Sequence, residues 1–472
     1  MIAQGLQFIS PELLLTAVAL VVGLGSVLFK DKRALDFLAL VGVVFAIGLL
    51  PHSTRTSVTV FSNMLVNDGF SLFFKTVILG MAALVILMSM GYRSLDEDDR
   101  GEYYFFLLAM TVSMLLAVSS QNLVMIYLTL EGVSLMSYIM AGYLKRDSFS
   151  SEAGIKYFLF GALSTAITLY GISLIYGLFG TLDLALISHV IRPEIAQQPI
   201  FIIAALLVLA GFGFKCSLVP FHMWTPDVYE GAPTPVAAFF SVAPKAMGFA
   251  FILRVFVQCF GAGFLQWSTV GVAMAVVTMI VGNVVALSQN NMKRLLAYST
   301  IAQAGYMLVG LAIPTPDGIK AVLFYIFIYG LMNLGAFAAV IAVSNGVKSE
   351  KIDDYAGLYQ KDSFLAIVLA VCLLSLAGLP PLAGFLAKFF IIAAAVQAKF
   401  VAVAVILVVN SVIALYYYVR VVKVMFLTET KNPSSLPQSA GIRLALVVIL
   451  CGNIAFGVWP HPILEWLSRI VF

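Results

Sequence analysis

Long apolar segments separated by short polar connections run through the whole chain. A helix that crosses a bilayer needs about 20 mostly apolar residues. Fourteen segments meet this requirement, near residues 11–29, 34–51, 69–91, 103–119, 122–143, 155–178, 199–220, 236–260, 267–288, 294–312, 318–343, 363–396, 400–428 and 441–468. The pattern predicts an all-α polytopic membrane protein with about 14 transmembrane helices.

Proline interrupts two of these segments. The seventh runs into Pro220 and Pro226, and the twelfth is cut by Pro380 and Pro381. Proline removes a backbone donor and clashes with the preceding turn. Non-helical backbone at membrane depth requires protein or water to satisfy it. We therefore expect helices 7 and 12 to be discontinuous.

Two short motifs recur at a nearly constant separation. Ser120-Gln121-Asn122 returns as Ser288-Gln289-Asn290, and Ala210-Gly211 returns as Ala377-Gly378. Each separation covers five segments, an odd number, which predicts two inverted five-helix repeats of the kind that transport proteins use. The expected parts are helices 1–3 in residues 1–102, a first repeat in 103–260, a second repeat in 261–430 and helix 14 in 431–472.

The composition is that of a chain surrounded by lipid. Hydrophobic residues make up 62% of the chain and charged residues 11%, and the mean hydropathy is +1.03. A soluble domain carries about 25% charged residues. The net charge of +4 is spread over the connections, which predicts no nucleic-acid partner. The four cysteines lie in apolar segments without the spacing of metal ligands, so we expect no metal site.

The basic residues of the connections predict an orientation, because cytoplasmic loops carry an excess of Lys and Arg. With the N-terminus outside, the inner connections hold sixteen basic residues and the outer ones five. The inner set is Lys30, Lys32, Arg33, Arg93, Arg100, Lys145, Arg146, Lys293, Arg294, Lys348, Lys351, Lys361, Arg420, Lys423, Lys431 and Arg443. The outer set is Arg55, Arg192, Lys320, Lys399 and Arg469. Both termini are therefore expected outside, and the first segment is expected to be a membrane span rather than a cleaved signal.

One acid stands near the middle of the fifth segment. Glu131 shares a helical face with Tyr127, Ser134 and Tyr138, at spacings of four, three and seven residues. A protonatable carboxyl in the middle of a membrane suits a proton relay. The alternative is a structural acid that is hydrogen-bonded to neighbouring helices.

Two lysines lie beside the breaks in the apolar segments, and a third lysine follows another proline. Lys215 comes five residues before Pro220, where carbonyl groups lose their helical partners and a cation is stabilised. Lys245 follows Pro244, and Lys388 lies seven residues after Pro381. Lys215 facing Glu131 could change its charge when the partner moves. The alternative for each lysine is a side chain that extends to the membrane surface.

Other polar residues are less decisive. Lys156 follows Glu152 by four residues, so a surface ion pair is as good an explanation as a relay. His222 could bridge Lys215 to Lys245 through water, or could cap a helix or lie in a loop. Asp227 and Glu230 are expected to cap the short helix after the break. Lys75 and Arg254 are expected to be packing or edge charges.

The sequence contains no phosphate-binding loop, no dinucleotide motif and no haem or iron–sulfur ligand set. We therefore expect no redox centre and no nucleotide hydrolysis on this chain, so that the energy for transport comes from a partner.

Four stretches resemble a known family: PFHMWTPDVYEGAPTPV at 220–236, APKAMGFAFILRVF at 243–256, LEGVSLMSYIMAGY at 130–143 and LAGLPPLAGFLAKF at 376–389. They are similar to the antiporter-like subunit N family of bacterial proton-translocating NADH–quinone oxidoreductase, respiratory complex I. The related subunits L and M usually carry Leu-Pro-Asp-Ala where this chain has TPDVY, and subunit L also has a long lateral helix at its C-terminus. The resemblance covers essentially the whole chain.

The resemblance implies a role for each candidate residue. Glu131 and Lys215 match the charged pair of helices 5 and 7, Lys245 the central lysine of helix 8, and Lys388 the lysine of the broken helix 12. Lys156 and His222 match accessory members of the same hydrophilic axis. The family implies NADH, FMN, iron–sulfur clusters and quinone on partner subunits, and none on this chain.

The resemblance also implies a setting. It implies contacts with antiporter-like subunit M, with small subunits K and J and with lipid, in the bacterial inner membrane with both termini periplasmic. Two other functions remain open at this point. One is a subunit of a sodium/proton antiporter, which shares the fold, and the other is a scaffold that conducts no protons.

Overall fold

The computed structural model of the protein describes residues 2–29, 32–53, 58–261, 266–429, 436 and 438–470. Within these residues, thirteen helices are long and apolar enough to cross a membrane. A further apolar pair, α17 and α18, occupies the region predicted as the twelfth span. The chain is therefore a helical, multi-pass membrane protein, as the apolar pattern predicted.

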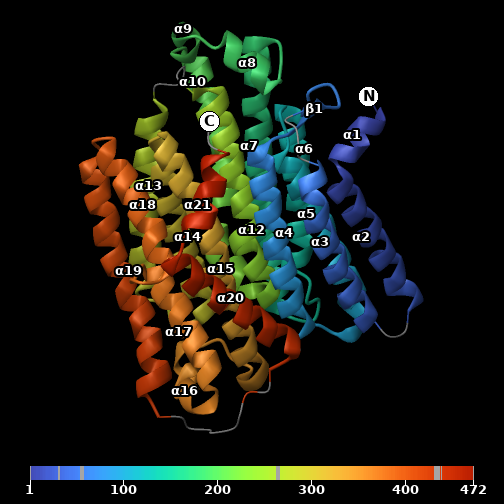
Figure 1. Ribbon diagram of the computed structural model, residues 1–472, viewed down its shortest axis with the longest axis vertical. Helices are drawn as coiled ribbons and strands as arrows, with labels where there is room; N and C mark the ends of the chain where they lie inside the picture. The colour runs from blue at the N-terminus through green and yellow to red at the C-terminus, as the bar shows by residue number, and fades with distance from the viewer. Residues whose placement is uncertain are drawn as a thin grey trace. The chain divides into compact units, whose positions relative to one another are not determined.

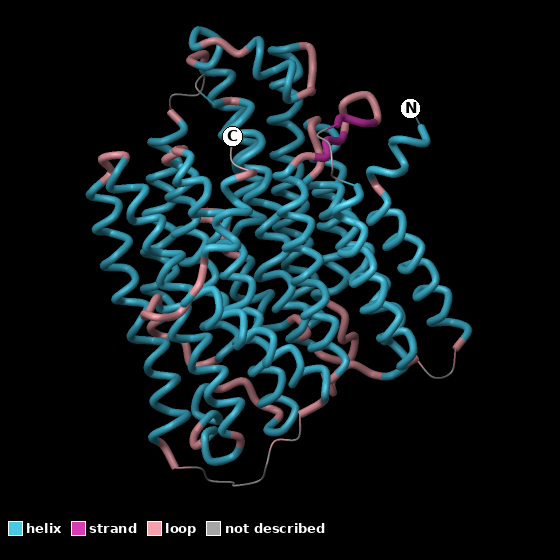
Figure 2. Tube along the Cα trace, in the orientation of Figure 1, coloured by secondary structure: helices cyan, strands magenta, loops and turns pink. Residues whose placement is uncertain are grey.

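Among the described residues, the first half of the chain contributes eleven α-helices, one short 3-10 helix (η1) and a small hairpin. They are α1 (Ile2–Phe8), α2 (Ser10–Leu28), α3 (Arg33–Ser53), β1 (Val58–Val60), β2 (Leu65–Asn67), α4 (Gly69–Met90), η1 (Glu97–Asp99), α5 (Arg100–Val118), α6 (Leu123–Ala141), α7 (Ser148–Phe179), α8 (Leu184–Val190), α9 (Pro193–Ala196), α10 (Pro199–Cys216) and α11 (Trp224–Gly231). The strands pair antiparallel with Thr59 opposite Val66 (Figure 2).

The second half is also helical. It contains α12 (Thr234–Ile252), η2 (Leu253–Cys259), α13 (Trp267–Ala286), α14 (Met292–Ala312), α15 (Pro316–Val347), η4 (Ile352–Tyr355), α16 (Leu358–Lys361), α17 (Ser363–Ala377), α18 (Ala383–Gln397), α19 (Val401–Leu427), α20 (Ala440–Val458) and α21 (His461–Ser468). The η2 segment is a stretch of π-helix that continues α12.

The chain divides into two compact units. The first contains Met1–Ile86, Leu95–Cys216 and Ala243–Ser268, and the second contains Leu87–Ser94, Ser217–Val242 and Thr269–Phe472. In the first unit α2 packs on α3 and α5, and α7 packs on α6 and α10 (Figure 1). In the second unit α15 is the central helix and packs on α14, α17, α18 and α20.

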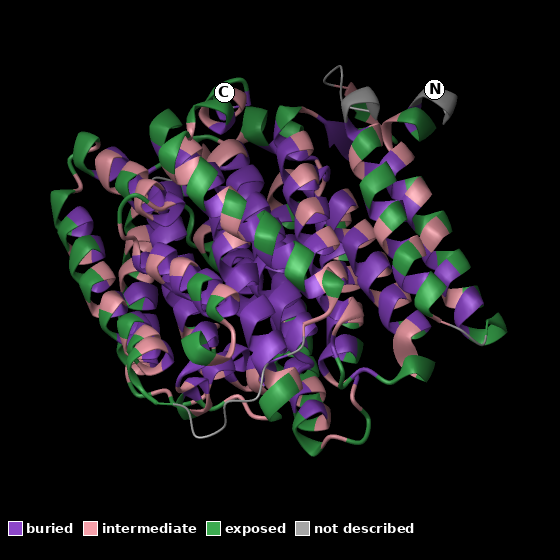
Figure 3. Cartoon of the chain, turned by 60° about the horizontal axis from the view of Figure 1, so that its bottom comes forward, coloured by how far each residue is buried: buried purple, intermediate pink, exposed green. Residues whose placement is uncertain are grey.

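Burial follows this packing. Helices near the N-terminus alternate buried and exposed residues along their length (Figure 3), as expected for helices with one face toward lipid. The α14 helix is almost wholly buried although it is the least hydrophobic of the spanning helices. Its polar residues therefore need partners from neighbouring helices, since buried polar groups are costly when they are unpaired.

The recurring Ser-Gln-Asn motif has the same structural role in both units. Asn122 caps the start of α6, and Asn291, just after the second motif, caps α14. Beside each cap the chain makes two backbone bonds to a later connection. These are Leu123 N to Leu182 O and Leu184 N to Gln121 O in the first unit, and Met292 N to Glu350 O and Ile352 N to Asn290 O in the second. The same local arrangement thus occurs twice, about one repeat length apart.

The last apolar segment is not a single helix. The sequence predicted one span over 441–468, whereas α20 ends at Val458 and α21 begins at His461. The reason is the Trp459-Pro460-His461-Pro462 stretch, because proline removes backbone donors and disfavours helical geometry in the residue before it. Lys30, Arg55 and Lys431, which entered the predicted orientation, lie outside the described residues.

Candidate functional site

Glu131 lies at the middle of α6 and is half-buried. The Tyr127 side chain, one turn earlier, lies near the Glu131 carboxylate and interacts with it electrostatically. Ser134 and Tyr138 are buried on the following turns. The predicted polar face is therefore present on α6, with its acid next to a phenol.

Lys215 lies in the last turn of α10 and is only 2% exposed. Its ammonium nitrogen is 5.6 Å from the centre of the Tyr157 ring of α7. It makes no hydrogen bond within the described part of the chain. Glu131 is the acid whose charge acts on Lys215, but the two groups form no direct ion pair in the described structure. The expected partners are thus electrostatic neighbours that are not in contact.

Aromatic rings lie between α6 and α10. The Tyr138 ring packs edge-on against Tyr157, with centroids 5.1 Å apart. Tyr157 in turn lies 6.0 Å from the Phe214 ring, next to Lys215 in the chain. Tyr138 belongs to the predicted polar face, whereas Tyr157 is not among the residues that the sequence predicted for the site. Tyr157 directly follows Lys156 in the sequence, and nothing in this local pattern indicates that Tyr157 contacts Tyr138 and Lys215.

Lys245 is hydrogen-bonded to the end of α10. It is 1% exposed on α12, and its ammonium donates to the backbone oxygen of Cys216, the last residue of α10, at 3.1 Å. Gly248 permits this approach, because a Cβ at that position would lie 2.6 Å from the Cys216 sulfur. The helix-end carbonyl that we expected to stabilise Lys215 is therefore the partner of Lys245.

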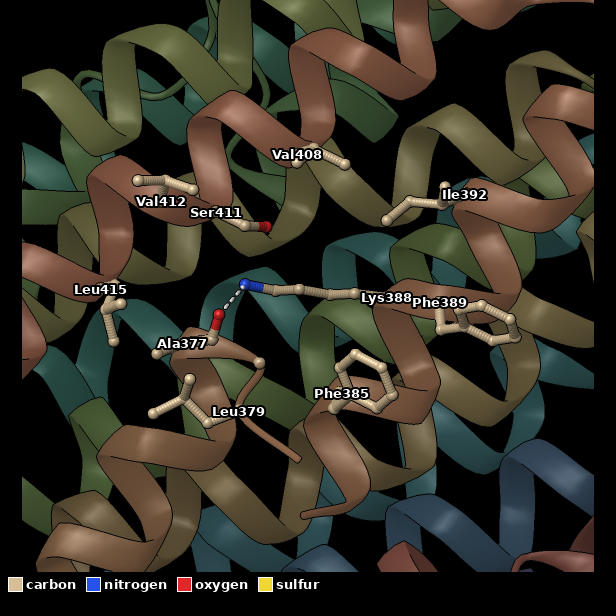
Figure 4. A pocket seen from close by; sticks show the side chains of 11 residues that line it. Ala377, Leu379, Phe385, Lys388, Phe389, Ile392, Val408, Ser411, Val412 and Leu415 are labelled. Carbon is tan, nitrogen blue, oxygen red and sulfur yellow. Dashed lines mark hydrogen bonds between the residues drawn. The ribbon is translucent and has the colours of Figure 1, made fainter. Parts of the chain in front are cut away.

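Lys388 repeats this bond in the second unit. It is 4% exposed on α18 and donates to the backbone oxygen of Ala377, the last residue of α17, at 2.9 Å (Figure 4). Its ammonium also lies 4.7 Å from the centre of the Tyr306 ring. Gly378, next to Ala377, has φ +91° and would place a Cβ 2.9 Å from the lysine stem.

Both interrupted helices therefore end in the same way. Each last residue is followed by a residue in the left-handed conformation, Ser217 with φ 58° and Gly378 with φ 91°. Each freed carbonyl accepts a hydrogen bond from a buried lysine. The structure thus matches Ser217 to Gly378, whereas the recurring Ala-Gly pairs had matched Gly211 to Gly378.

A buried polar network surrounds Tyr306 on α14. The Asn283 amide donates to the Tyr306 hydroxyl at 2.9 Å and to the Asn410 oxygen at 3.1 Å. Gln303 donates to the backbone oxygen of Leu376, near the end of α17, at 3.0 Å and accepts from the Tyr325 hydroxyl. This network is not among the features that the sequence predicted. The polar residues of α14 at helical spacing (Ser299, Thr300, Gln303 and Tyr306) were the signal that could have found it.

The two accessory candidates have different surroundings. Lys156 forms an ion pair of 2.7 Å with Glu152, one turn earlier, and both side chains are partly exposed. The surface pair that we had considered for Lys156 is therefore present. His222 lies in the turn of residues 217–223 between α10 and α11 and is half-buried. It belongs to the second compact unit, whereas Lys215 and Lys245 belong to the first.

The acids after the first break do not cap α11. The cap position is Met223, which forms no side-chain cap, and both acids bind Arg294 of α14 instead. The Arg294 guanidinium is 2.9 Å from Asp227 and 2.7 Å from Glu230. The capping prediction was wrong. Arg294 comes from a distant helix, and its guanidinium forms charge-assisted hydrogen bonds with both carboxylates, which are stronger than bonds to backbone N–H groups.

Of the two expectations for Lys75 and Arg254, packing charges or edge charges, the structure shows packing charges. Lys75 is fully buried and lies 2.7 Å from the Glu12 carboxylate. Arg254 is 5% exposed and binds both oxygens of Asp68, at 2.8 and 2.9 Å. Asp68 lies just before α4, where burial raises the pKa of its carboxyl but the Arg254 guanidinium holds that pKa below its ordinary value. Neither Glu12 nor Asp68 was predicted from the sequence, since neither acid stands out locally.

The chain is similar to known membrane proteins over its whole length. Residues 120–414 match the family described as NADH:quinone oxidoreductase/Mrp antiporter, TM. NADH-quinone oxidoreductase subunit N of Trichlorobacter lovleyi is 43% identical, over 99% of this chain and 97% of that protein. The chain belongs to the NADH-quinone oxidoreductase subunit N family. NAD(P)H-quinone oxidoreductase subunit 2 of a Synechocystis species is 41% identical, over 92% of this chain and 86% of that protein.

Solved structures agree with this family. A chain of respiratory complex I from Thermus thermophilus is 32% identical, with a TM-score of 0.84 over 97% of this chain and 99% of that chain. A chain of the Mrp complex from a Dietzia species has a TM-score of 0.85 over 100% of this chain and 97% of that chain, at 21% identity. At that identity the second likeness shows a shared fold alone.

Proposed function

We propose that this member of the subunit N family is a membrane-arm subunit of bacterial NADH–quinone oxidoreductase and translocates protons through Glu131, Lys215, Lys245 and Lys388. The observation that carries the proposal is the pair of buried lysines, Lys245 and Lys388, each bonded to the last carbonyl of an interrupted helix. Ionisable groups inside a membrane are costly and mark ion pathways.

The physical basis is that the charged form of each lysine is stabilised by one helix-end carbonyl, and that this carbonyl can move. A carbonyl at a helix C-terminus stabilises an ammonium, since the helix dipole is negative there. A small displacement of the α10 or α17 end would break the bond and favour release of the proton. Lys215, buried without a hydrogen bond in the described structure, would respond in the same way to the charge on Glu131.

The remaining roles follow the family resemblance. Lys156 and His222 act as accessory proton carriers. Electron transfer takes place on partner subunits that hold NADH, FMN, iron–sulfur clusters and quinone, and this chain has no redox centre. Subunits M, K and J are its neighbours in the complex, and both termini face the periplasm of the inner membrane.

The test is Lys245→Ala in the assembled enzyme. NADH oxidation by quinone and proton uptake into inverted vesicles are measured together, and assembly is checked on a native gel. We expect a loss of NADH-driven proton uptake, because the amine at the α10 end is gone. Lys145→Ala, at an exposed lysine of the α6–α7 connection, is the control. Full pumping by an assembled Lys245→Ala enzyme would overturn the proposal.

The matching family, whose description also names the Mrp antiporter, supports a second candidate, a subunit of a sodium/proton antiporter. This candidate predicts cation exchange in vesicles without NADH and copurification with small membrane proteins only. A third candidate, a scaffold, predicts that Glu131→Ala and Lys215→Ala leave turnover and pumping intact while truncation prevents assembly.

A further inference from the structure

The side of α19 that faces away from the protein is hollowed in two places. A cavity of about 220 Å³ lies between α18, α19 and the end of α17, and is lined by the stem of Lys388 with Phe389, Val408 and Val412 (Figure 4). Phe389, Val408 and Val412 are each about half exposed or more. Apolar side chains that are exposed on a membrane-spanning helix face lipid, so this cavity opens toward the bilayer.

The second hollow continues the first along α19. It has a volume of about 470 Å³ and passes Tyr416 and Val419 to Arg420 and Lys423. Val412 and Leu415 line both hollows. The two therefore form one groove, apolar beside Lys388 and basic at its other end.

The basic end is built to hold an anion. Lys423 is exposed, and Arg420 is half-buried with its guanidinium donating to the backbone oxygens of Leu287 and Gln289. These bonds hold Arg420 in place without neutralising its charge. Basic residues at the inner end of a membrane helix attract anionic head groups.

The length of the groove fits one acyl chain. Arg420 and Val408 are twelve residues apart on α19, or about 18 Å along a helix that rises about 1.5 Å per residue. The hydrocarbon half of a bilayer is about 15 Å thick. A lipid with its phosphate at Arg420 would therefore place its chain end near Val408.

We propose that an anionic phospholipid binds along α19, with its phosphate at Arg420 and Lys423 and the end of one acyl chain in the cavity beside Lys388. Charge selects the head group, and the apolar groove selects the chain. The chain end excludes water from the lipid side of Lys388 and so prevents protons from leaking there. Only this consequence rests on the proposed function, whereas the binding itself does not.

The experiment uses the intact complex in phosphatidylcholine vesicles that contain a trace of photoreactive lipid. The lipid is phosphatidylglycerol with a diazirine at the end of one acyl chain, and phosphatidylcholine with the same chain is the comparison. After illumination, the labelled peptides are identified by mass spectrometry. We expect phosphatidylglycerol to label the segments around Phe389 and Val408 at least fivefold more than phosphatidylcholine does.

Two variants test the two ends of the groove. Arg420→Gln with Lys423→Gln should remove the preference for phosphatidylglycerol, and Val412→Phe should reduce labelling by filling the groove. Val409→Phe is the matched control, since Val409 is similarly exposed on α19 but does not line either hollow.

Equal labelling by the two lipids, unchanged in the variants, would reduce the site to ordinary boundary lipid and overturn the proposal. Absence of label from both lipids would mean that another subunit covers the groove, which also overturns it. The outcome is separable from the proton role, because labelling does not depend on pumping. A Lys245→Ala enzyme that still pumps leaves a positive labelling result intact.

Discussion

At the scale of single residues, the chain places amines where a helix has ended and a carbonyl is left over. Lys245 donates a hydrogen bond to the backbone oxygen of Cys216, and Lys388 donates one to the backbone oxygen of Ala377. A buried carbonyl without a donor costs about 1–3 kcal/mol, so each lysine stabilises the break beside it. The same bond holds the amine at a defined position inside an apolar environment, which is what a proton carrier requires.

The contact between Gly378 and Lys388 gives a prediction at this scale. Gly378→Ala introduces left-handed strain of about 1–2 kcal/mol and a Cβ that would lie 2.9 Å from the lysine stem. We expect a lower thermal stability of the assembled complex and a loss of pumping, because the lysine must move away from Ala377. Stability is measured by thermal unfolding and pumping by vesicle acidification.

Gly180→Ala is the matched control for Gly378→Ala. Gly180 has φ +66° but no neighbour within 4 Å of an added Cβ. The Gly180→Ala variant should show the same loss of thermal stability as Gly378→Ala but should leave proton pumping intact. If both variants pump normally, the position of Lys388 does not matter for transport.

At the scale of elements, close approach between helices decides which groups meet. The α12 helix can approach the end of α10 because Gly248 has no side chain. A Cβ at this position would occupy the space next to the Cys216 sulfur. Similarly, η2 brings Arg254 to Asp68 at the start of α4. Each contact links segments that are far apart in the sequence.

The approach of α12 to α10 can be tested by a double substitution. Gly248→Ala places a methyl group 2.6 Å from the Cys216 sulfur and should separate Lys245 from the Cys216 oxygen. We expect a severalfold loss of pumping in an assembled complex. Cys216→Ala removes the sulfur but keeps the backbone oxygen, so Gly248→Ala with Cys216→Ala should restore pumping. Additive losses in the double variant would contradict this account.

The Asp68–Arg254 pair predicts a dependence of stability on pH. Arg254 holds the pKa of the Asp68 carboxyl below its ordinary value of 3.8. A lowered pKa in the folded state stabilises the fold above the unfolded pKa, and this stabilisation is lost as the pH falls through the folded value. The difference in melting temperature between the wild type and Asp68→Asn should be constant from about pH 8 to 5 and shrink below about pH 4. A difference that grows in acid would contradict the ion pair.

At the scale of the whole molecule, the chain is a series of membrane spans whose basic residues concentrate in alternate connections. This excess of Lys and Arg predicts periplasmic termini. The repeated bonds next to Asn122 and Asn291 show that the two compact units use the same local design.

The predicted orientation is measurable with single cysteines and a maleimide that cannot cross the membrane. Lys145 and Lys399 are both exposed, and the distribution of basic residues assigns them to opposite sides of the membrane. Lys145→Cys should therefore be labelled only in inverted vesicles, and Lys399→Cys only in right-side-out cells. The native Cys216, Cys259 and Cys372 are buried and should contribute little background, and the exposed Cys451 is replaced by Ser in both variants. Labelling of both positions from one side would contradict the assigned orientation.

The sequence by itself determined the membrane spans, the interrupted segments and the charges within them. These features are local, because a span is about 20 apolar residues and a proline acts on its own turn. The sequence also identified the family, through motifs such as PFHMWTPDVYEGAPTPV.

Only the tertiary structure decided which groups meet. It paired Lys245 with the Cys216 oxygen, Lys75 with Glu12, and Asp227 and Glu230 with Arg294. The physical reason is that a buried charge takes whichever partner the packing of distant helices brings within about 3 Å. Spacing along one helix carries no information on that packing. The polar spacing of α14 could indicate a buried polar face, but neither the partners of that face nor the Lys215–Tyr157 contact could be predicted from local patterns.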